Sequence, residues 1–199
     1  MNPRFSTALV LVAALAAGAM VLAASGEGED PPPAAAEGFE GALIPPGVRA
    51  PDFELSNQDG DTIRMRDLRG RPVVVTFLYT NCEDACPPQA QQVTGALDEL
   101  GHDLPALAIA VDPPSDTPDS ARRFLAENRL TGRIDFVLGS REQLEPLWDA
   151  YAVRPQSVKE EHQARTVLVD SRGFQRVGFP LDKTTPERLA HDLRLLEAE

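Results

Sequence analysis

Residues 73–88 decide the fold; they read VVVTFLYTNCEDACPP. The first six of these residues are apolar or β-branched, which is typical of a buried strand, and a helical pattern follows the second cysteine. Cys82 and Cys86, the two cysteines of the chain, therefore lie where a strand gives way to a helix. Two thiols in such a place can form a reversible disulfide or bind a soft metal ion.

Strands and helices alternate on both sides of this stretch. The hydrophobic pattern predicts strands at 52–55, 62–65, 72–79, 104–111, 134–138, 166–169 and 174–178, and helices at 88–100, 117–128, 142–151 and from 185 onward. An Asp-Gly pair at 59–60 is typical of a hairpin turn between the first two strands. Trp148 has helical spacing with Leu144 and Tyr151 and is expected in the core. This order predicts an α/β fold with a central mixed sheet flanked by helices and an N-terminal β-hairpin.

The first 48 residues differ in composition from the rest of the chain. Arg4 precedes an apolar run at 8–24, and small residues end that run, so residues 1–25 are predicted to be a cleaved signal peptide. The alternative is a membrane anchor over residues 5–24. Residues 26–48 are rich in Pro, Glu and Ala and are predicted to form a disordered linker, followed by one domain at 49–199. The domain is expected outside the cytoplasm, in the periplasm or on the outer face of the cytoplasmic membrane.

The charge of the chain narrows the range of partners. Its 19 Lys and Arg residues against 31 Asp and Glu residues give a formal net charge of −12. Because binding to phosphates needs a basic face, nucleic acid is excluded as a partner. Contact with a membrane is expected only through the N-terminal segment. Outside the cytoplasm a pair of thiols tends to oxidise, so a reductant or a metal must keep Cys82 and Cys86 from remaining a disulfide.

The local sequence makes opposing predictions about the two thiols. Pro87 predicts that the helix begins just after Cys86, with the amide of Gln89 as the donor to the Cys86 sulfur. That amide and the helix dipole lower a thiol pKa, whereas Glu83 and Asp84 raise it by repelling a thiolate. The net direction stays open at this point.

A metal bound by two thiolates needs at least one more ligand. Thiolates favour Cu(I) or Zn(II), and the chain contains three histidines. His102 follows the first long helix and His191 lies on the last one, where both are expected to be solvated. His162 lies just before the strand predicted at 166–169. From spacing alone, a polar loop residue is its commoner role and a metal ligand is the alternative.

Two acids, Asp112 and Asp116, follow the strand predicted at 104–111. They can shape a metal site or a docking surface. A strand end and a helix start explain them more simply, with Thr117 as N-cap and Pro118 at the first helical position.

Several stretches together resemble one family. Residues 67–72 (DLRGRP), 77–87 (FLYTNCEDACP) and 111–118 (VDPPSDTP) are similar to segments of the Sco/SenC proteins, the copper-binding, thioredoxin-fold assembly factors of cytochrome c oxidase. His162 precedes Asp170 by the spacing of the family's copper histidine. The resemblance covers roughly residues 50 to 195. Departures from the family pattern are Glu83 and Ala85 between the cysteines, and Glu161 and Gln163 beside the histidine.

The resemblance implies a thioredoxin-like fold and a copper site. By resemblance, Cys82, Cys86 and His162 are the metal ligands, and the set suits Cu(I) or Cu(II). The implied function is that of a copper chaperone, not a classical enzyme, for the dinuclear copper centre of cytochrome c oxidase. The implied partners are the copper-accepting oxidase subunit and a further copper chaperone or thiol reductant.

Two other functions use the same cysteines. As a thiol–disulfide oxidoreductase, the protein would attack a target disulfide through Cys82, taken as the more exposed thiol, and resolve the mixed disulfide through Cys86. The target is then the oxidase subunit or another exported protein. A peroxiredoxin-type peroxidase is disfavoured, because Tyr79 stands where that family has a threonine.

Overall fold

The computed structural model describes residues 38–199, except residue 83 and residues 154–164. The predicted signal peptide or anchor lies outside the described residues, as does most of the predicted linker. The strands are β1 (Ala42–Leu43), β2 (Glu54–Ser56), β3 (Thr62–Arg64), β4 (Val73–Leu78), β5 (Ala106–Ala110), β6 (Asp135–Val137), β7 (Arg165–Val169) and β8 (Gln175–Pro180). The α-helices are α2 (Cys86–Leu100), α3 (Pro118–Glu127), α4 (Arg141–Ala150) and α5 (Pro186–Glu197). Two 3-10 turns cover Met65–Leu68 and Leu181–Lys183.

The central sheet has six strands in the order β1-β8-β7-β4-β5-β6. Strands β4, β5 and β6 are parallel, whereas β7 is antiparallel to both β4 and β8, and β1 is antiparallel to β8. Every residue of β4 is buried, as its apolar, β-branched composition predicts for a strand covered on both faces. The sheet is therefore mixed, and the predicted fold class is confirmed.

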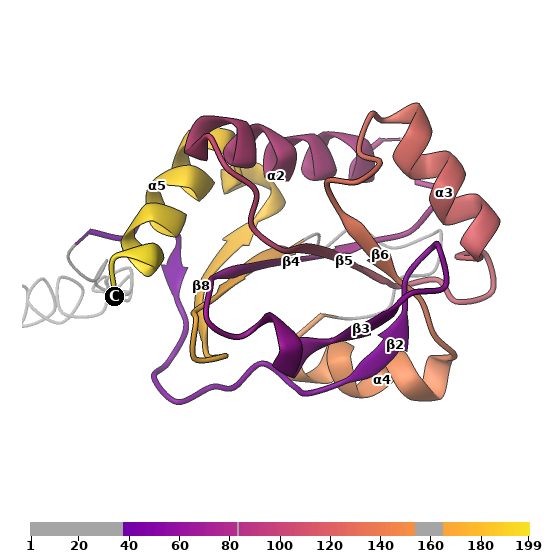
Figure 1. Cartoon of the computed structure of the whole chain (residues 1–199), viewed down its shortest axis with the longest axis horizontal. Coiled ribbons are helices and arrows are strands. Elements are labelled where there is room, and N and C mark those ends of the chain that lie inside the picture. The colour runs from indigo at the N-terminus through magenta and orange to yellow at the C-terminus, as the bar shows by residue number, and fades with distance from the viewer. Residues whose placement is uncertain (1–37, 83, 154–164) are drawn as a thin grey trace, which may run out of the picture. The chain divides into compact units, whose positions relative to one another are not determined.

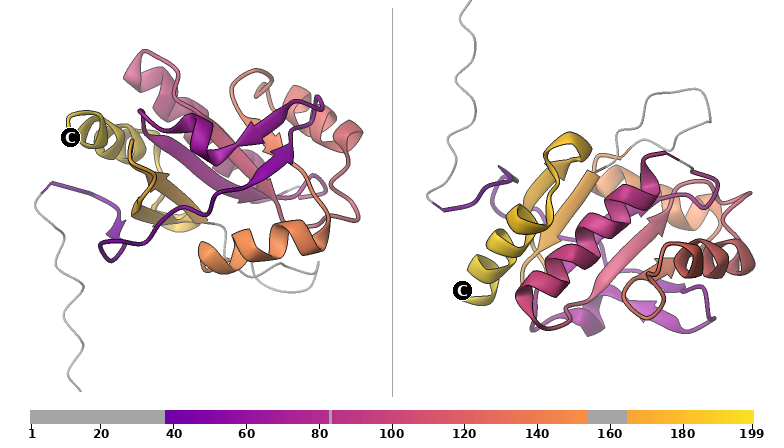
Figure 2. Two further views of the ribbon diagram at one scale, coloured as in Figure 1. Left: turned by 60° about the horizontal axis from the view of Figure 1, so that its bottom comes forward. Right: turned by 90° about the horizontal axis from the view of Figure 1, so that it is seen from above.

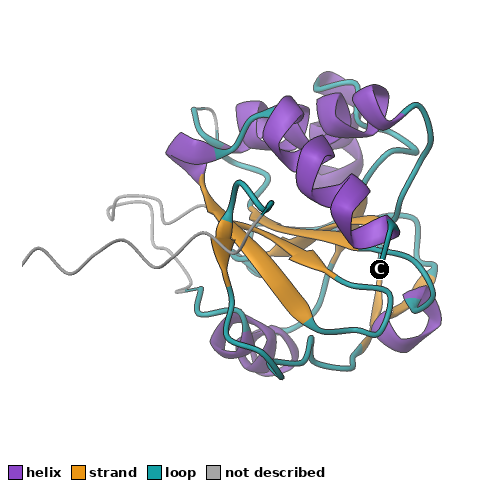
Figure 3. Cartoon of the chain, turned by 90° about the vertical axis from the view of Figure 1, so that its left-hand side faces the viewer, coloured by secondary structure: helices purple, strands orange, loops and turns teal. Residues whose placement is uncertain are grey.

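Helices cover both faces of the sheet (Figure 1). Helices α2, α3 and α5 lie on one face, and α4 lies on the other face together with the β2–β3 hairpin. The view from above in Figure 2 shows α5 running beside α2, and Figure 3 shows the sheet between the two helical layers. Both helical layers meet the sheet through apolar side chains, so the core extends over both faces.

The hairpin protects one edge of the sheet. Gly60 has a φ of 86°, which the predicted Asp-Gly turn requires. Beside it, the Gln58 side chain accepts the Phe136 N–H at 2.7 Å, and Asn57 Nδ2 donates to Asp135 at 2.9 Å. The side chains of the turn thus bind the outer edge of β6, and both of them are buried.

The other edge of the sheet is formed by residues from the span expected to be linker. Strand β1 pairs with β8 through Ala42–Gly178 and Leu43–Val177. The amides of Glu40 and Gly41 donate to the buried Asp192 carboxylate at 2.8 and 2.9 Å. A Cβ on Gly41 would lie 2.3 Å from Val177, so only glycine fits there. A two-residue strand in a Pro- and Glu-rich composition has no periodicity by which it could be found.

No helix among the residues that the structure describes is long and apolar enough to cross a membrane.

Trp148 lies in the core, as predicted, and offers a test of it. The side chain is fully buried, and its Nε1 donates to the carbonyl of Ala110 at the end of β5 at 2.9 Å. We expect Trp148→Phe to lower the free energy of unfolding by about 1–3 kcal/mol, because it leaves a cavity and an unpaired carbonyl. Urea unfolding followed by circular dichroism measures this. The control, Arg123→Ala on the exposed side of α3, should change stability by less than about 0.5 kcal/mol.

Candidate metal centre

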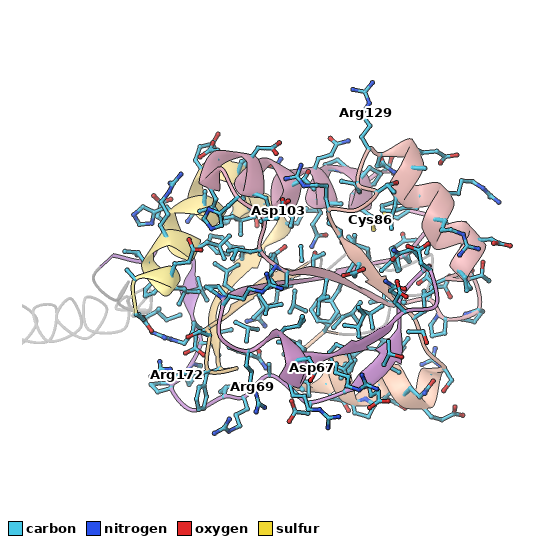
Figure 4. The ribbon with its side chains drawn as sticks, in the orientation of Figure 1. Asp67, Arg69, Cys86, Asp103, Arg129 and Arg172 are labelled. Carbon is cyan, nitrogen blue, oxygen red and sulfur yellow. The ribbon has the colours of Figure 1, made fainter. Side chains whose placement is uncertain are left out.

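The two cysteines lie at the carboxyl end of β4, on the sheet edge where open α/β folds place their sites. Cys82 is in the loop after β4. Cys86 is the first residue of α2, and it is labelled in Figure 4. Both are free thiols. Their exposed fractions are 4% for Cys82 and 3% for Cys86, so both thiols are buried and Cys82 is the more exposed one only by a small margin.

The sulfur of Cys82 is the acceptor of the pair. It accepts the Cys86 backbone N–H at 3.1 Å, and the Cys86 thiol, the Tyr79 hydroxyl and the Ala85 amide also donate to it. The predicted donor was wrong: the Gln89 N–H bonds to the Ala85 carbonyl at 3.1 Å and does not reach a sulfur. The reason is that α2 begins at Cys86, so the first free amides of the helix point back at Cys82.

This geometry divides the two thiols into a thiolate and a thiol. The hydrogen bond from Cys86 is the main cause that lowers the pKa of Cys82, with the backbone donors adding to it against the effect of burial, to about 5. The pKa of Cys86 is raised, because its own S–H is donated to Cys82 and because it is buried. At neutral pH the site is therefore a Cys82 thiolate held by a Cys86 thiol.

Tyr79 is a third member of the site, one to which the sequence analysis gave no role there. Burial, followed by the hydrogen bond to Cys82, raises the pKa of its hydroxyl. The hydroxyl therefore stays protonated and donates to the sulfur. Its place directly after the buried strand was the available signal, because the end of such a strand is where site residues gather.

Asp116 connects the loop that carries Cys82 to the loop that follows β5. One carboxylate oxygen accepts the Thr80 N–H at 2.7 Å, and the other accepts the Asp112 N–H at 2.9 Å. Asp116 is 6% exposed, and burial raises the pKa of its carboxyl against these hydrogen bonds. A strand end and a helix start were expected to explain Asp116. Thr117 is the N-cap of α3, as predicted, and the Asp116 carboxylate is used instead to join the two loops.

Gln89 fastens α2 to the sheet one turn beyond Cys86. It is fully buried, and its Nε2 donates to Thr76 Oγ1 on β4 at 2.6 Å and to the Arg165 carbonyl on β7 at 3.2 Å. Strand β7 begins directly after residues 154–164. This amide thus links three elements that surround the site, and it is a second residue that periodicity alone did not single out.

The histidines separate into two groups. His162 lies outside the described residues. His102 bonds to Glu197 just past the far end of α2, a 15-residue helix about 22 Å long, so it is remote from Cys86 at the start of that helix. His191 contacts its neighbour Asp192 on α5. Within the described part of the chain, no three His, Cys, Asp or Glu side chains are grouped as metal ligands.

The donor set fits a soft metal ion. A thiolate that forms near pH 5 is ready to bind at neutral pH, and a second sulfur within hydrogen-bonding contact can join it by releasing one proton. Sulfur donors select Cu(I) or Zn(II) over hard cations. The same pair can instead exchange with a disulfide.

The chain thus has a thioredoxin-like α/β domain with a thiolate–thiol pair at the end of its central strand. This combination defines a class of proteins whose thiols bind a metal ion or exchange with a disulfide. The SCO1/SenC family model matches residues 44–197, and the chain belongs to this family.

Relatives of known name agree with that assignment. The SCO1 protein homolog of Bacillus subtilis is 32% identical over 98 residues, which is 47% of this chain and about half (51%) of that protein. The structure of ScoI from Bradyrhizobium japonicum with copper bound is 28% identical, with a TM-score of 0.63, covering 74% of this chain and 99% of that one. A SCO1/SenC family lipoprotein from Bacillus anthracis is 25% identical, with a TM-score of 0.66, covering 79% and 100%.

The division of charge between the sulfurs can be tested with Cys86→Ala. Removing the thiol donor takes away the largest cause of the low pKa, so the pKa of Cys82 should rise well above its native value of about 5. Thiolate ultraviolet absorbance of the reduced protein, followed against pH, measures it. In Cys82→Ala the low-pH transition should disappear. A transition near pH 5 that survives in Cys82→Ala would contradict the assignment.

Proposed function

We propose that this protein is an extracytoplasmic copper chaperone for cytochrome c oxidase. It binds copper through Cys82, Cys86 and His162, and helps to assemble the dinuclear copper centre by passing the ion to the copper-accepting subunit. The observation that carries this proposal is the Cys82 thiolate, with its pKa of about 5, held beside a second thiol on a SCO1/SenC scaffold. The copper-bound ScoI structure supports copper as the cargo.

The site's hydrogen bonds suit reversible binding. Cys82 offers a charged sulfur first, and Cys86 joins when its proton leaves, so loading two sulfurs releases one proton from the pair at neutral pH. His162 supplies the imidazole that also suits Cu(II). Transfer then proceeds by ligand exchange, as thiols of the acceptor replace Cys82 and Cys86 one at a time. Another copper chaperone loads the site or a thiol reductant maintains it.

The location follows from the N-terminal segment. The apolar run at 8–24 supports export, with a membrane anchor over residues 5–24 as the alternative to cleavage. The Bacillus anthracis relative is a lipoprotein. No cysteine lies near the apolar run of this chain, so a lipid thioether is not its means of attachment.

The same thiols favour a second candidate function, the reduction of a disulfide. The Cys82 thiolate attacks a target disulfide, forms a mixed disulfide and expels one target thiolate. Cys86 then loses its proton and attacks the Cys82 sulfur, which closes the Cys82–Cys86 disulfide and releases the second target thiol. Two electrons pass from the protein to the target, and an external thiol reductant restores the pair.

Copper titration of the reduced full chain is the first test. We expect one equivalent to bind, with sulfur-to-copper charge-transfer bands in the Cu(II) form. Cys82→Ser and Cys86→Ser should each weaken binding by more than about 100-fold, beyond the loss that a residue which only orients a ligand causes. Absence of copper binding by folded, reduced protein would leave the reductase as the remaining function.

His162→Ala separates the two functions. Under the chaperone proposal it lowers copper affinity and changes the Cu(II) spectrum, while the rate of disulfide reduction with a dithiol reductant stays at the native value. His102→Ala is the matched control, because His102 is a surface histidine remote from the cysteines. Equal copper affinity in the native and His162→Ala proteins would remove His162 from the ligand set.

A further inference from the structure

The loop that carries Cys82 is hydrogen-bonded to the segment that follows the neighbouring strand, β5. Asp116 follows β5 and lies buried between this loop and its own. Its two oxygens accept the amides of Thr80, two residues before Cys82, and of Asp112, just after β5. Thr80 Oγ1 adds a bond to the Ser115 carbonyl at 3.3 Å. Two loops at the carboxyl edge of the sheet are thus joined through one side chain.

The turn that presents Asp116 is itself fixed. The amides of Ser115 and Asp116 donate to the Asp112 carbonyl at 2.9 and 2.8 Å. Thr117 and Ser120 form a capping box at the start of α3, and Ser120 Oγ donates to the Ser115 carbonyl at 2.8 Å. The turn that carries the carboxylate is therefore fixed at the start of a capped helix.

A helix start does not account for this carboxylate. Thr117 and Ser120 already provide the capping hydrogen bonds of α3, so Asp116 is free of that role. Among the described residues, no Lys or Arg forms an ion pair with it. A buried carboxylate without a cation is costly unless hydrogen bonds compensate, and here both compensating amides belong to the loops at the thiol site.

We propose that Asp116 is a positioning residue for the Cys82–Cys86 pair. By holding the Thr80 amide, it keeps the loop in the conformation in which Cys82 Sγ accepts the Cys86 N–H. The dithiol is then preorganised to bind a metal and is protected from closing into a disulfide. The metal-binding part of this inference rests on the proposed function, whereas the dithiol part does not.

The chain provides a matched control in Asp192. This carboxylate is also buried and also accepts two backbone amides, from Glu40 and Gly41 at 2.8 and 2.9 Å. It lies on α5 and binds the segment before β1, away from the cysteine loop. Asp116→Asn and Asp192→Asn therefore weaken the same kind of carboxylate–amide bond at two places, and Asp192→Asn also alters the contact with His191. A loss of stability common to both variants carries no information about the thiols.

The test measures the equilibrium between dithiol and disulfide in dithiothreitol redox buffers. Each protein molecule that oxidises at neutral pH loses the one S–H bond of Cys86 and gains one S–S bond. Its two electrons, together with the Cys86 proton and one proton from solvent, reduce one molecule of oxidised dithiothreitol to the dithiol. We expect Asp116→Asn to shift this equilibrium toward the disulfide by about tenfold and to weaken copper binding by about 10- to 100-fold, the range for residues that support ligands. Asp192→Asn should leave both values unchanged.

Each outcome decides the proposal. An unchanged equilibrium in Asp116→Asn, or an equal shift in Asp192→Asn, overturns it. If Asp116→Asn does not fold, Thr80→Val decides, since it removes the hydroxyl that bonds to the Ser115 carbonyl and to the Asp116 carboxylate: a shift toward the disulfide supports the positioning role of Asp116, and an unchanged equilibrium overturns it. If the native chain binds no copper and Asp116→Asn still shifts the equilibrium, the proposed function is refuted, whereas the positioning role of Asp116 is supported.

Discussion

The pairing of β4 between two neighbours is the constraint on which the site depends. Strand β4 is hydrogen-bonded to β5 on one side and to β7 on the other, so its carboxyl end is fixed relative to both. Cys82 follows β4, Asp116 follows β5, and β7 begins where residues 154–164 end. Because parallel strands end at one edge, groups far apart in sequence meet there without a dedicated subdomain.

Hydrogen bonding sets the chemistry at this edge more than charge does. The acids at positions 83 and 84 were expected from the sequence to oppose a thiolate, yet the pKa of Cys82 is about 5, because its sulfur accepts bonds from the Cys86 thiol and amide, from Ala85 and from Tyr79. A donor in contact outweighs a carboxylate that water can screen. Which of the two thiols ionises first therefore depends on the conformation of the loop. The contacts that hold the loop in this conformation control the reactivity of the pair.

The sequence predicted well what depends on neighbours in the chain. The β4 run, the hairpin turn at Gly60 and the Thr117 start of α3 all carry local signals, and the structure has each of them. It did not predict what depends on distant partners. The donors to the Cys82 sulfur, the amide of Gln89 between α2 and β7, and the pairing of β1 with β8 arise from tertiary contacts that no periodicity encodes. Asp116 shows the difference: its place before a helix was evident, but the partners of its carboxylate were not.

The way in which the two edges of the sheet are covered limits how other proteins can bind this one. The turn residues Asn57 and Gln58 occupy the outer side of β6, and β1 offers only a two-residue edge on the opposite side. A long unpaired strand edge is a template onto which a foreign strand can add, with aggregation as the common result. Strand addition is therefore disfavoured at both edges of the described sheet. A partner has to recognise side chains and loops, and the loops at the carboxyl edge of the sheet are the ones that carry the thiols.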